Sequence, residues 1–569
     1  MKSENLKGVW QLSAFDTDNF LDKKIEFRYS HFDKIDKINY FKNKTFDYYD
    51  VTIRILSNKL NDIHNTNLSS KYWNYLVGPW LFKFLEYYFD KYLIISQCDL
   101  KNFDLKKKFF PIKNFLEFYK FSNDHDYNKF IFNQINVFLH TGKYSLNIER
   151  NDLSNDTIKT TVKNKIVKSF KKDIKNFLLK FKKEDEYNTD VVNFNLDLSP
   201  KELFKLSNKK RDLLNNFISK SSELEITNNF IDKKKRNEKL DENLKSEDQF
   251  INLINNCLLL NLPSFYLENF ELLNNFYADQ VRNIKINKLL LRAPLELKDN
   301  YRYLIANLAE KGTKIISFQE GGIGKSLQQT EFVKYSKLFC DDFYIWSEKK
   351  TNGAKNFLCT KTFWIQKYKI IDNKTLIVLG SVKPYFFSLY EGNFPNFGFH
   401  QTKLTTNFIS GFENLFGLSD VILRLHNDNG FREMEYYSKK FKKLTIEDRK
   451  INPYFYNLLN RSRLKIFTSD YTANMQSYII NHPSIFLWNE KMYLANPTFE
   501  HLYEKMRKNK MLFINSDECL NHLNEVNNKL NKWWFSEEVQ SIRAEYLRNF
   551  CPISSNFKNE FLNKVIKKT

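Results

Sequence analysis

The clearest hydrophobic pattern lies in the second half of the chain, where short apolar runs alternate with longer amphipathic segments. The segments Leu297–Lys311 and Thr472–Asn481 have apolar residues at helical spacing. Strands that alternate with helices are typical of doubly wound parallel sheets, and a break near Asn373 predicts two such sheets facing each other. The apolar runs predict strands at Ile286–Pro294, Lys314–Phe318, Phe343–Trp346, Lys374–Gly380, Val421–Leu425, Leu464–Phe467 and Ser484–Trp488.

The first half of the chain has a different pattern, in which aromatic residues recur at helical spacing. In Leu60–Ile95 they form one heavily apolar face, which predicts a buried aromatic helix. Ser69 and Ser70 are candidate N-caps, and Gly78-Pro79 predicts a kink. His64, just before this helix, is expected at the surface or in a cap.

Four parts are predicted from these patterns. Residues 1–285 form a largely helical part with an exposed charged insertion near 221–249, and residues 286–373 hold the first sheet. Residues 374–515 form a second, nucleotide-binding sheet domain. Residues 516–569 are helical, with one long element over Asp517–Phe550, and are expected to pack back across the body.

Length and composition agree with a folded protein of several domains. The chain has 569 residues, of which 42% are hydrophobic, so two or three domains are expected. A formal net charge of +22 normally suggests a polyanionic partner. Here the lysines are spread along the chain, and the many Asn, Lys, Phe and Ile residues are typical of AT-rich coding. We therefore favour a solvated lysine surface over an anionic-membrane contact, and predict no specific nucleic-acid partner.

The six cysteines form no CxxC pair and no Cys/His cluster, which argues against structural zinc and fits a reducing compartment. No signal-peptide core and no bilayer-spanning apolar run occurs in the sequence, so the predicted location is the cytoplasm. Thr160–Asp185 is a basic amphipathic segment that offers peripheral contact with an anionic membrane at the inner face. An ordinary packed helix with solvated lysines is the favoured interpretation of this segment.

The strongest chemical signal lies in Thr313–Trp346, where an apolar run leads into a glycine-rich turn and then a helix-compatible segment. Such a turn lets backbone N–H groups approach a ligand phosphate, because a Cβ would block the approach. Glu320 precedes the glycines, at a strand tip where a carboxylate is placed for proton transfer. Lys325 follows them. The glycines of the turn are Gly321, Gly322 and Gly324.

The same turn resembles a phosphate-binding P-loop in part. Gly324-Lys325-Ser326 fits the end of G-x-x-x-x-G-K-[ST], but the leading glycine position is Gln319. No clean apolar strand ending in a magnesium-binding Asp follows. An ATP-dependent phosphotransferase is therefore a lesser alternative, and a tight structural turn with a solvent lysine is comparably supported.

Six segments spread over most of the chain carry recognisable motifs: LNDIHN…YWNYLVGPWLFKFLEYYFDKY, GTKIISFQEGGIG, DDFYIW, RLHNDNGF, SRLKIFTSDYTANMQSYIINHPSIFLWNEKMY and LNKWWFSEEVQSIRAEYLRNF. Together they resemble a family of bacterial surface-carbohydrate transferases from lipopolysaccharide and capsule loci. That family is distantly related to CDP-glycerol and CMP-sugar (Kdo-type) transferases. The resemblance implies a GT-B-like α/β fold, with two facing doubly wound parallel-sheet domains, a helical aromatic-rich N-terminal part and a C-terminal crossing helix.

The resemblance also implies a catalytic base at the His position of the family's glycine turn, which is Glu320 here. Gln476 stands where the family has an acidic residue, and Tyr471 where it has Ser or Thr. For Ser469 and Thr472 helix capping is an alternative role, as a surface ion pair is for Arg424. The residues predicted to bind the donor and its phosphates are Gly321, Gly322, Gly324, Lys325, Arg424, His426, Ser469, Thr472 and Gln476.

We predict an enzyme that moves a sugar or related group from a nucleotide-activated donor to an acceptor hydroxyl. The acceptor is expected to be a glycan, a lipid-linked glycan or a glycoprotein, in surface polysaccharide, lipopolysaccharide or glycoprotein assembly. No cofactor and no metal are predicted, because GT-B enzymes stabilise the leaving group with helix N-termini and cationic side chains. The departures at Glu320 and Gln476 leave a second alternative open, a non-catalytic homologue that binds carbohydrate or acts as a scaffold.

Overall fold

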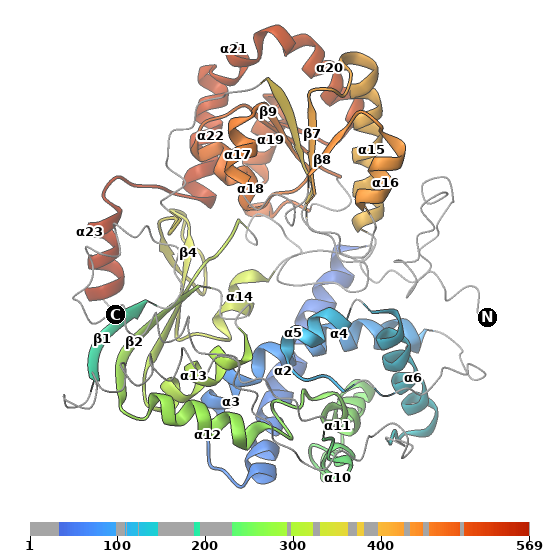
Figure 1. Cartoon of the computed structure of the whole chain (residues 1–569), viewed down its shortest axis with the longest axis vertical. Coiled ribbons are helices and arrows are strands. Elements are labelled where there is room, and N and C mark those ends of the chain that lie inside the picture. Colours follow the sequence, from blue (N-terminus) through green and yellow to red (C-terminus); the bar gives the residue numbers. More distant parts are fainter. Residues whose placement is uncertain are drawn as a thin grey trace, which may run out of the picture.

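In the computed structural model of the protein, two parallel sheets are stacked end to end, and a helical part flanks the first of them (Figure 1). The upper half of Figure 1 holds the second sheet and its helices, and the lower half holds the first sheet and the helical part. The predicted α/β class with two parallel-sheet domains is therefore confirmed. The residues described are 34–97, 109, 111–122, 124–145, 187–193, 230–292, 298–322, 331–361, 373–380, 397–425, 433–447, 455–489 and 494–567.

The helical part is built around an aromatic core. Ser69 caps the first turn of α3 by accepting from the Tyr72 N–H at 3.1 Å, as predicted. The kink expected at Gly78-Pro79 is a break between α3 and α4, where Pro79 occupies the first turn because its missing N–H is not needed there. The helices are α2 (Ile35–His64), α3 (Ser70–Leu76), α4 (Gly78–Ser96), α5 (Phe115–Phe121), α6 (His125–Thr141), α10 (Lys233–Arg236), α11 (Gln249–Asn261) and α12 (Phe270–Val281).

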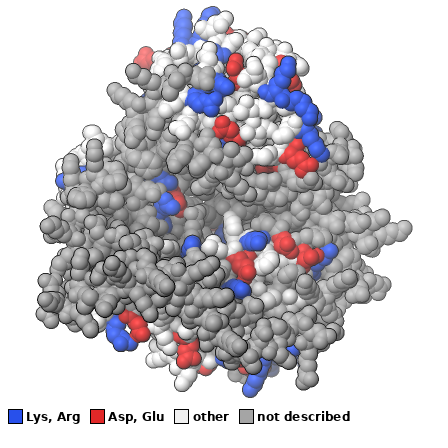
Figure 2. Space-filling model, viewed as in Figure 1, with Lys and Arg blue, Asp and Glu red and all other residues white. Residues whose placement is uncertain are grey.

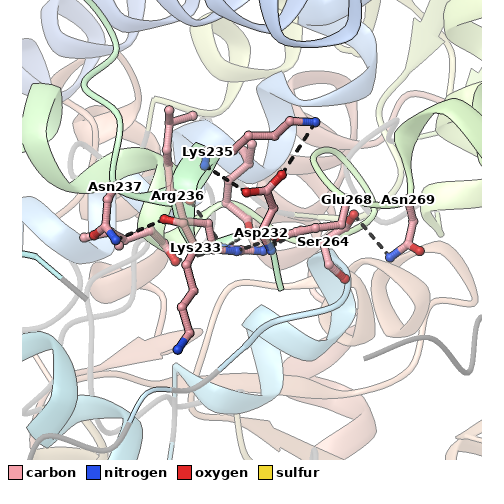
Figure 3. A network of polar contacts seen from close by, with 11 residues as sticks. Asp232, Lys233, Lys235, Arg236, Asn237, Ser264, Glu268 and Asn269 are labelled. Carbon is pink, nitrogen blue, oxygen red and sulfur yellow. Dashed lines mark hydrogen bonds and ion pairs between the residues drawn. The ribbon is translucent and has the colours of Figure 1, made fainter. Parts of the chain in front are cut away.

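The described half of the charged segment 221–249 differs from the exposed insertion that we predicted. Figure 3 shows Arg236, which is 1% exposed, directed at Glu268. Its Nε and Nη2 donate to that carboxylate at 2.6 and 2.8 Å, and Nη1 donates to three backbone carbonyls at the end of α11. A bidentate partner and helix carbonyls together satisfy a buried guanidinium, which a charge count along the sequence does not reveal.

The first sheet has the strand order β1-β2-β3-β4-β5, with every neighbouring pair parallel. Alternate residues point to opposite faces, so Leu289 and Ile315 face the helical core while Leu290 and Ile316 face the other side. The sequence pattern missed β1 and β5. The elements are β1 (Tyr187–Asn193), β2 (Ile284–Arg292), α13 (Asp299–Glu310), β3 (Lys314–Phe318), α14 (Phe332–Lys337), β4 (Asp342–Trp346) and β5 (Lys355–Phe357).

The second sheet has the order β11-β10-β9-β6-β7-β8 and is also parallel throughout. Leu376 lies in the core that includes α18 and α22, and its neighbour Ile377 lies in the core shared with α15, α16 and α20. The elements are β6 (Lys374–Val378), α15 (Phe397–Phe416), β7 (Val421–Arg424), α16 (Glu433–Lys440), β8 (Thr445–Glu447), α17 (Phe455–Asn460), β9 (Ser462–Phe467), α18 (Thr472–Ile479), β10 (Ser484–Leu487), α19 (Glu500–Lys508), β11 (Leu512–Phe513) and α20 (Ser516–Val526).

The C-terminal helices connect the two halves. The single element predicted over Asp517–Phe550 is wrong, because α20 is followed by two further helices, α21 (Leu530–Trp534) and α22 (Glu537–Phe550). The last helix, α23 (Phe557–Phe561), returns to the first sheet, as Figure 1 shows. Its Phe561 ring lies 6.0 Å from that of Phe318, so α23 covers the sheet face turned away from the helical core. The helix that reaches the first sheet thus lies after the element predicted over Asp517–Phe550.

Charged side chains are dispersed over the surface. On the face in Figure 2, the described Lys and Arg residues form several separate groups on both halves, with Asp and Glu between them. In the part of the chain that the structure describes, every helix is too short or too polar to span a lipid bilayer. The basic segment Thr160–Asp185 lies outside the described residues.

Candidate functional site

The glycine turn follows β3 and is held in place by the residue before the predicted base. Gln319 is 3% exposed, and its Nε2 donates to the Gly321 carbonyl at 2.6 Å. Its Oε1 accepts from the Trp346 N–H, at the end of the adjacent strand β4, at 2.9 Å. In the sequence, Gln319 stands out only as a departure from the P-loop pattern, whereas in the structure it ties the turn to the sheet.

Glu320 lies at the carboxyl end of the first sheet and contacts Arg292. The Arg292 Nε lies 2.7 Å from Glu320 Oε1, and the side chains are 29% and 17% exposed. Arg292 is the last residue of β2 and pairs in register with Phe318, so the two neighbouring parallel strands bring the pair together. The sequence signal for Arg292 is a cation near the end of the strand predicted over Ile286–Pro294.

The glycine turn touches the start of α18 in the other domain. The Gly322 N–H donates to Thr472 Oγ1 at 3.0 Å. A Cβ on Gly321 would lie 2.7 Å from the same oxygen, and a Cβ on Gly322 would lie 2.6 Å from the Tyr471 carbonyl carbon. A Cβ would therefore block a close approach to the backbone of α18 at Gly322 and to the Thr472 side chain at Gly321.

Thr472 and Ser469 do not cap the helix, so that alternative is wrong. The N-cap of α18 is Tyr471, whose side chain makes no capping hydrogen bond, and Thr472 is the first helical residue. Its hydroxyl accepts from the glycine turn instead. Gln476, one turn further along the same helix face, is 8% exposed and lies beneath Thr472.

Ser469 and Arg424 lie on either side of the end of β6, because this strand is paired with β9 on one side and β7 on the other. Both residues are 5% exposed, so a surface ion pair for Arg424 is excluded. A Cβ on Gly380, just after β6, would lie 2.7 Å from Ser469 Oγ. The structure thus brings Arg424 and Ser469 to one edge of the second sheet. Gly324, Lys325 and His426 lie outside the described residues.

Asp470, between Ser469 and α18, is a residue that sequence analysis missed. It is 1% exposed and accepts hydrogen bonds from Asn474 at 3.0 Å, from Tyr503 at 3.1 Å and from Tyr546. Burial, and then the Asp470 charge, raise the pKa of Tyr546 well above its usual value, so the phenol stays a donor. The carboxylate is thus buried among three donors beside the start of the helix.

The C-terminal end of α18 is held by residues of the segment LNKWWFSEEVQSIRAEYLRNF, the tail motif, which is one of those that resemble the transferase family. Arg543 Nη1 donates to the Tyr478 carbonyl at 2.5 Å. Trp534 Nε1 donates to Asn481 Oδ1 at 2.9 Å, and Asn481 donates to Gln540 at 3.0 Å. Residues of α21 and α22 thus fix both ends of the helix that meets the glycine turn. In the structure, these residues of the tail motif therefore support α18.

The described residues contain no group of three His, Cys, Asp or Glu side chains placed to hold a metal ion. The candidate groups at the carboxyl ends of the two sheets are backbone N–H donors, hydroxyls, the uncapped start of α18, the Arg292 and Arg424 side chains and the Glu320 carboxylate. Groups of these types can bind an anion and accept a proton from a hydroxyl.

Comparison with solved structures gives only distant likenesses. The Staphylococcus aureus MnaA–UDP co-structure covers 52% of this chain and 78% of its own, at 11% identity and TM-score 0.33. Acinetobacter baumannii MurG covers 52% and 79%, at 10% identity and TM-score 0.30. The wall teichoic acid polymerase TagF covers 52% and 84%, at 9% identity and TM-score 0.27.

Sequence comparison is decisive at the level of the family. No curated protein matches the chain. The model of a family described as LIC12162 family transferase matches residues 4–566, which is nearly the whole chain. The expected membership in a transferase family is thereby confirmed: the chain belongs to the LIC12162 family of transferases.

Proposed function

We propose that the protein transfers a sugar or a related group from a nucleotide-activated donor to an acceptor hydroxyl, in the assembly of a surface polysaccharide, lipopolysaccharide or glycoprotein. One observation carries the proposal: the glycine turn after β3 and the start of α18 after β9 meet, although they belong to different domains. Both lie at the carboxyl ends of parallel strands, where α/β proteins bind their ligands.

The donor phosphates lie at this meeting point in our proposal. The Gly322 N–H now donates to the Thr472 hydroxyl. A phosphate oxygen that enters between them replaces this hydroxyl as the acceptor, and the hydroxyl, which has its own proton, donates to the same phosphate. The start of α18 and the Arg424 guanidinium favour the negative charge that develops on the leaving group.

Glu320 is the general base of the proposed reaction. The acceptor oxygen attacks the anomeric carbon, the bond from that carbon to the phosphate oxygen breaks, and the electron pair leaves with the nucleotide. The proton of the acceptor hydroxyl passes to Glu320. Arg292, 2.7 Å away, orients the carboxylate at the edge of the sheet. The carboxylate thus takes the role of the family's His.

Thermal unfolding of the purified protein with CMP, CDP, UDP, GDP, TDP and Mg–ATP tests the proposal. A ligand at 100 times its Kd stabilises the native state by about 2.7 kcal/mol. We expect one of the mono- or diphosphate nucleotides to stabilise the protein, with no Mg–ATP present. Arg424→Ala should abolish it, because a charge-assisted hydrogen bond to phosphate contributes about 1.5–3 kcal/mol.

Arg282→Ala is the matched control, since Arg282 is 74% exposed on the surface of the helical part and should keep the full response. Stabilisation by Mg–ATP alone would replace our proposal with the phosphotransferase. No response to any nucleotide would favour a non-catalytic homologue.

A further inference from the structure

The peptide unit between Gly321 and Gly322 makes one of the contacts between the domains, beside others such as the bond from Lys349 Nζ to the Thr498 carbonyl. The carbonyl of this peptide unit accepts from Gln319 Nε2 at 2.6 Å, and its N–H donates to Thr472 Oγ1 at 3.0 Å. A trans peptide is planar, and its C=O and N–H point in opposite directions. A hydrogen bond that fixes the direction of the carbonyl therefore fixes the direction of the N–H as well.

The backbone alone does not determine this direction. Two consecutive glycines have more accessible φ and ψ values than any other dipeptide, so the peptide between them turns easily. Gln319, in contrast, has little freedom. It is 3% exposed, its backbone N–H donates to the Tyr344 carbonyl at 2.9 Å, and its Oε1 accepts from the Trp346 N–H.

The orientation of the Gln319 amide follows from these partners. Its oxygen faces an N–H donor and its nitrogen faces a carbonyl acceptor. A rotated amide would place two acceptors together and two donors together, and would leave buried polar groups unpaired. The side chain thus has one stable arrangement, and that arrangement holds the Gly321 carbonyl on the side of the first sheet.

We infer that Gln319 is a positioning residue that directs the Gly322 N–H out of the first domain and toward the second. Without ligand, the N–H meets Thr472. In the transferase, the same N–H meets a donor phosphate, and this consequence rests on the proposed function. The orientation of the peptide does not rest on it, so the two are tested separately.

Hydrogen–deuterium exchange of the full chain without ligand, resolved to the Gly322 amide, tests the inference. Gln319→Met keeps the size of the side chain and removes both of its hydrogen bonds. We expect exchange at Gly322 to accelerate by about tenfold, the effect of losing one hydrogen bond of typical strength. Thr472→Val should accelerate the same amide, and the double variant should exchange no faster than the faster single variant.

Two controls separate positioning from general damage. Gln134→Met makes the same substitution at a buried glutamine of the helical part and should leave Gly322 unchanged. The amides of β3 should stay protected in every variant. If Gln319→Met does not fold, Gln319→Glu keeps the shape and the bond from Trp346 but, when ionised, loses the donor.

An unchanged exchange rate at the Gly322 amide in a folded Gln319 variant would overturn the inference. So would a double variant in which the rate increases caused by Gln319→Met and Thr472→Val multiply. The nucleotide series gives the second readout. A nucleotide that stabilises the wild type should bind to Gln319→Met with an affinity at least tenfold lower. If no nucleotide stabilises the wild type, the proposed function fails, while accelerated exchange still establishes the positioning role.

Discussion

The pairing of Glu320 with Arg292 shows how little of a site one residue reveals. Glu320 was found because it precedes the glycines, and its partner lies at the end of the neighbouring strand. The 2.7 Å contact of Arg292 Nε with Glu320 Oε1 places a positive charge beside the carboxylate. The candidate base is therefore one half of an ion pair, which the lone residue did not suggest.

Glu320→Gln tests the role of the base. The amide keeps the size of the side chain but does not accept a proton, so we expect turnover to fall by about 10²–10⁴-fold with the donor class identified by the nucleotide series. Donor binding should be retained. Glu242→Gln, at a side chain 70% exposed, is the control and should have wild-type turnover. Normal turnover by a folded Glu320→Gln protein would remove Glu320 from the mechanism.

At the scale of the elements, α18 depends on its surroundings. It has eight residues, and an isolated helix of this length is not stable in water. Asp470 holds its start and Arg543 of α22 holds its end. The tail motif, far away in sequence, therefore supports the helix that meets the glycine turn.

Packing of α2 against α12 makes the stability of the helical part pH-dependent. The His64 ring lies 4.3 Å from that of Phe270, and its Nε2 lies 3.1 Å from the Tyr266 carbonyl. Burial, with a smaller contribution from Lys235, lowers the pKa of His64 from its usual 6.5 to about 4, although the contact with the Tyr266 carbonyl opposes the shift. Our expectation of a surface or capping histidine is therefore wrong, because the ring stacks within the aromatic core.

Between pH 6.5 and 4 the unfolded chain binds a proton at His64 that the native protein does not, so stability falls as the pH is lowered through this window. We expect the wild type to lose about 1–3 kcal/mol relative to His64→Phe over this range, measured by denaturant unfolding. Between pH 7 and 8 the difference between the two proteins should be constant. A constant difference down to pH 4 would contradict the assignment.

For the molecule as a whole, the contact between the glycine turn and the start of α18 depends on Gly322. Neither Gly321 nor Gly322 has a positive φ, so alanine at either position strains no backbone. A Cβ on Gly322 would press on the Tyr471 and Thr472 backbone, whereas one on Gly321 would press only on the end of the Thr472 side chain, which rotates. The two substitutions therefore differ in what has to move.

Gly322→Ala should separate the domains locally and destabilise the protein by about 1–3 kcal/mol, the usual effect of overpacking. Calorimetry should show a lower and broader transition, because the halves unfold less cooperatively. Gly321→Ala is the milder comparison and should cost less, because the Thr472 hydroxyl can rotate away, although this rotation removes its bond from Gly322. Equal behaviour of the two variants would mean that this contact does not couple the domains.

The local pattern of apolar and polar residues was sufficient to predict much of the fold. Buried parallel strands are short and continuously apolar, so β3 and β4 were located almost to the residue, and strand–helix alternation predicted both sheets. β1, with its polar sequence YNTDVVN, has no such signal and is a strand only because β2 pairs with it. The break between α20 and α22 was likewise hidden in a continuous helical pattern.

The candidate site divides in the same way. Glu320, the glycines and Thr472 were predicted because a turn that needs glycine and a strand end that carries a polar group are local features. The bond from Gly322 to Thr472, the Arg292 partner and the supports at Asp470 and Gln319 depend on which strand ends share an edge and which domains touch. Such proximity arises when the sheets pack, because parallel strands bring distant residues to one edge.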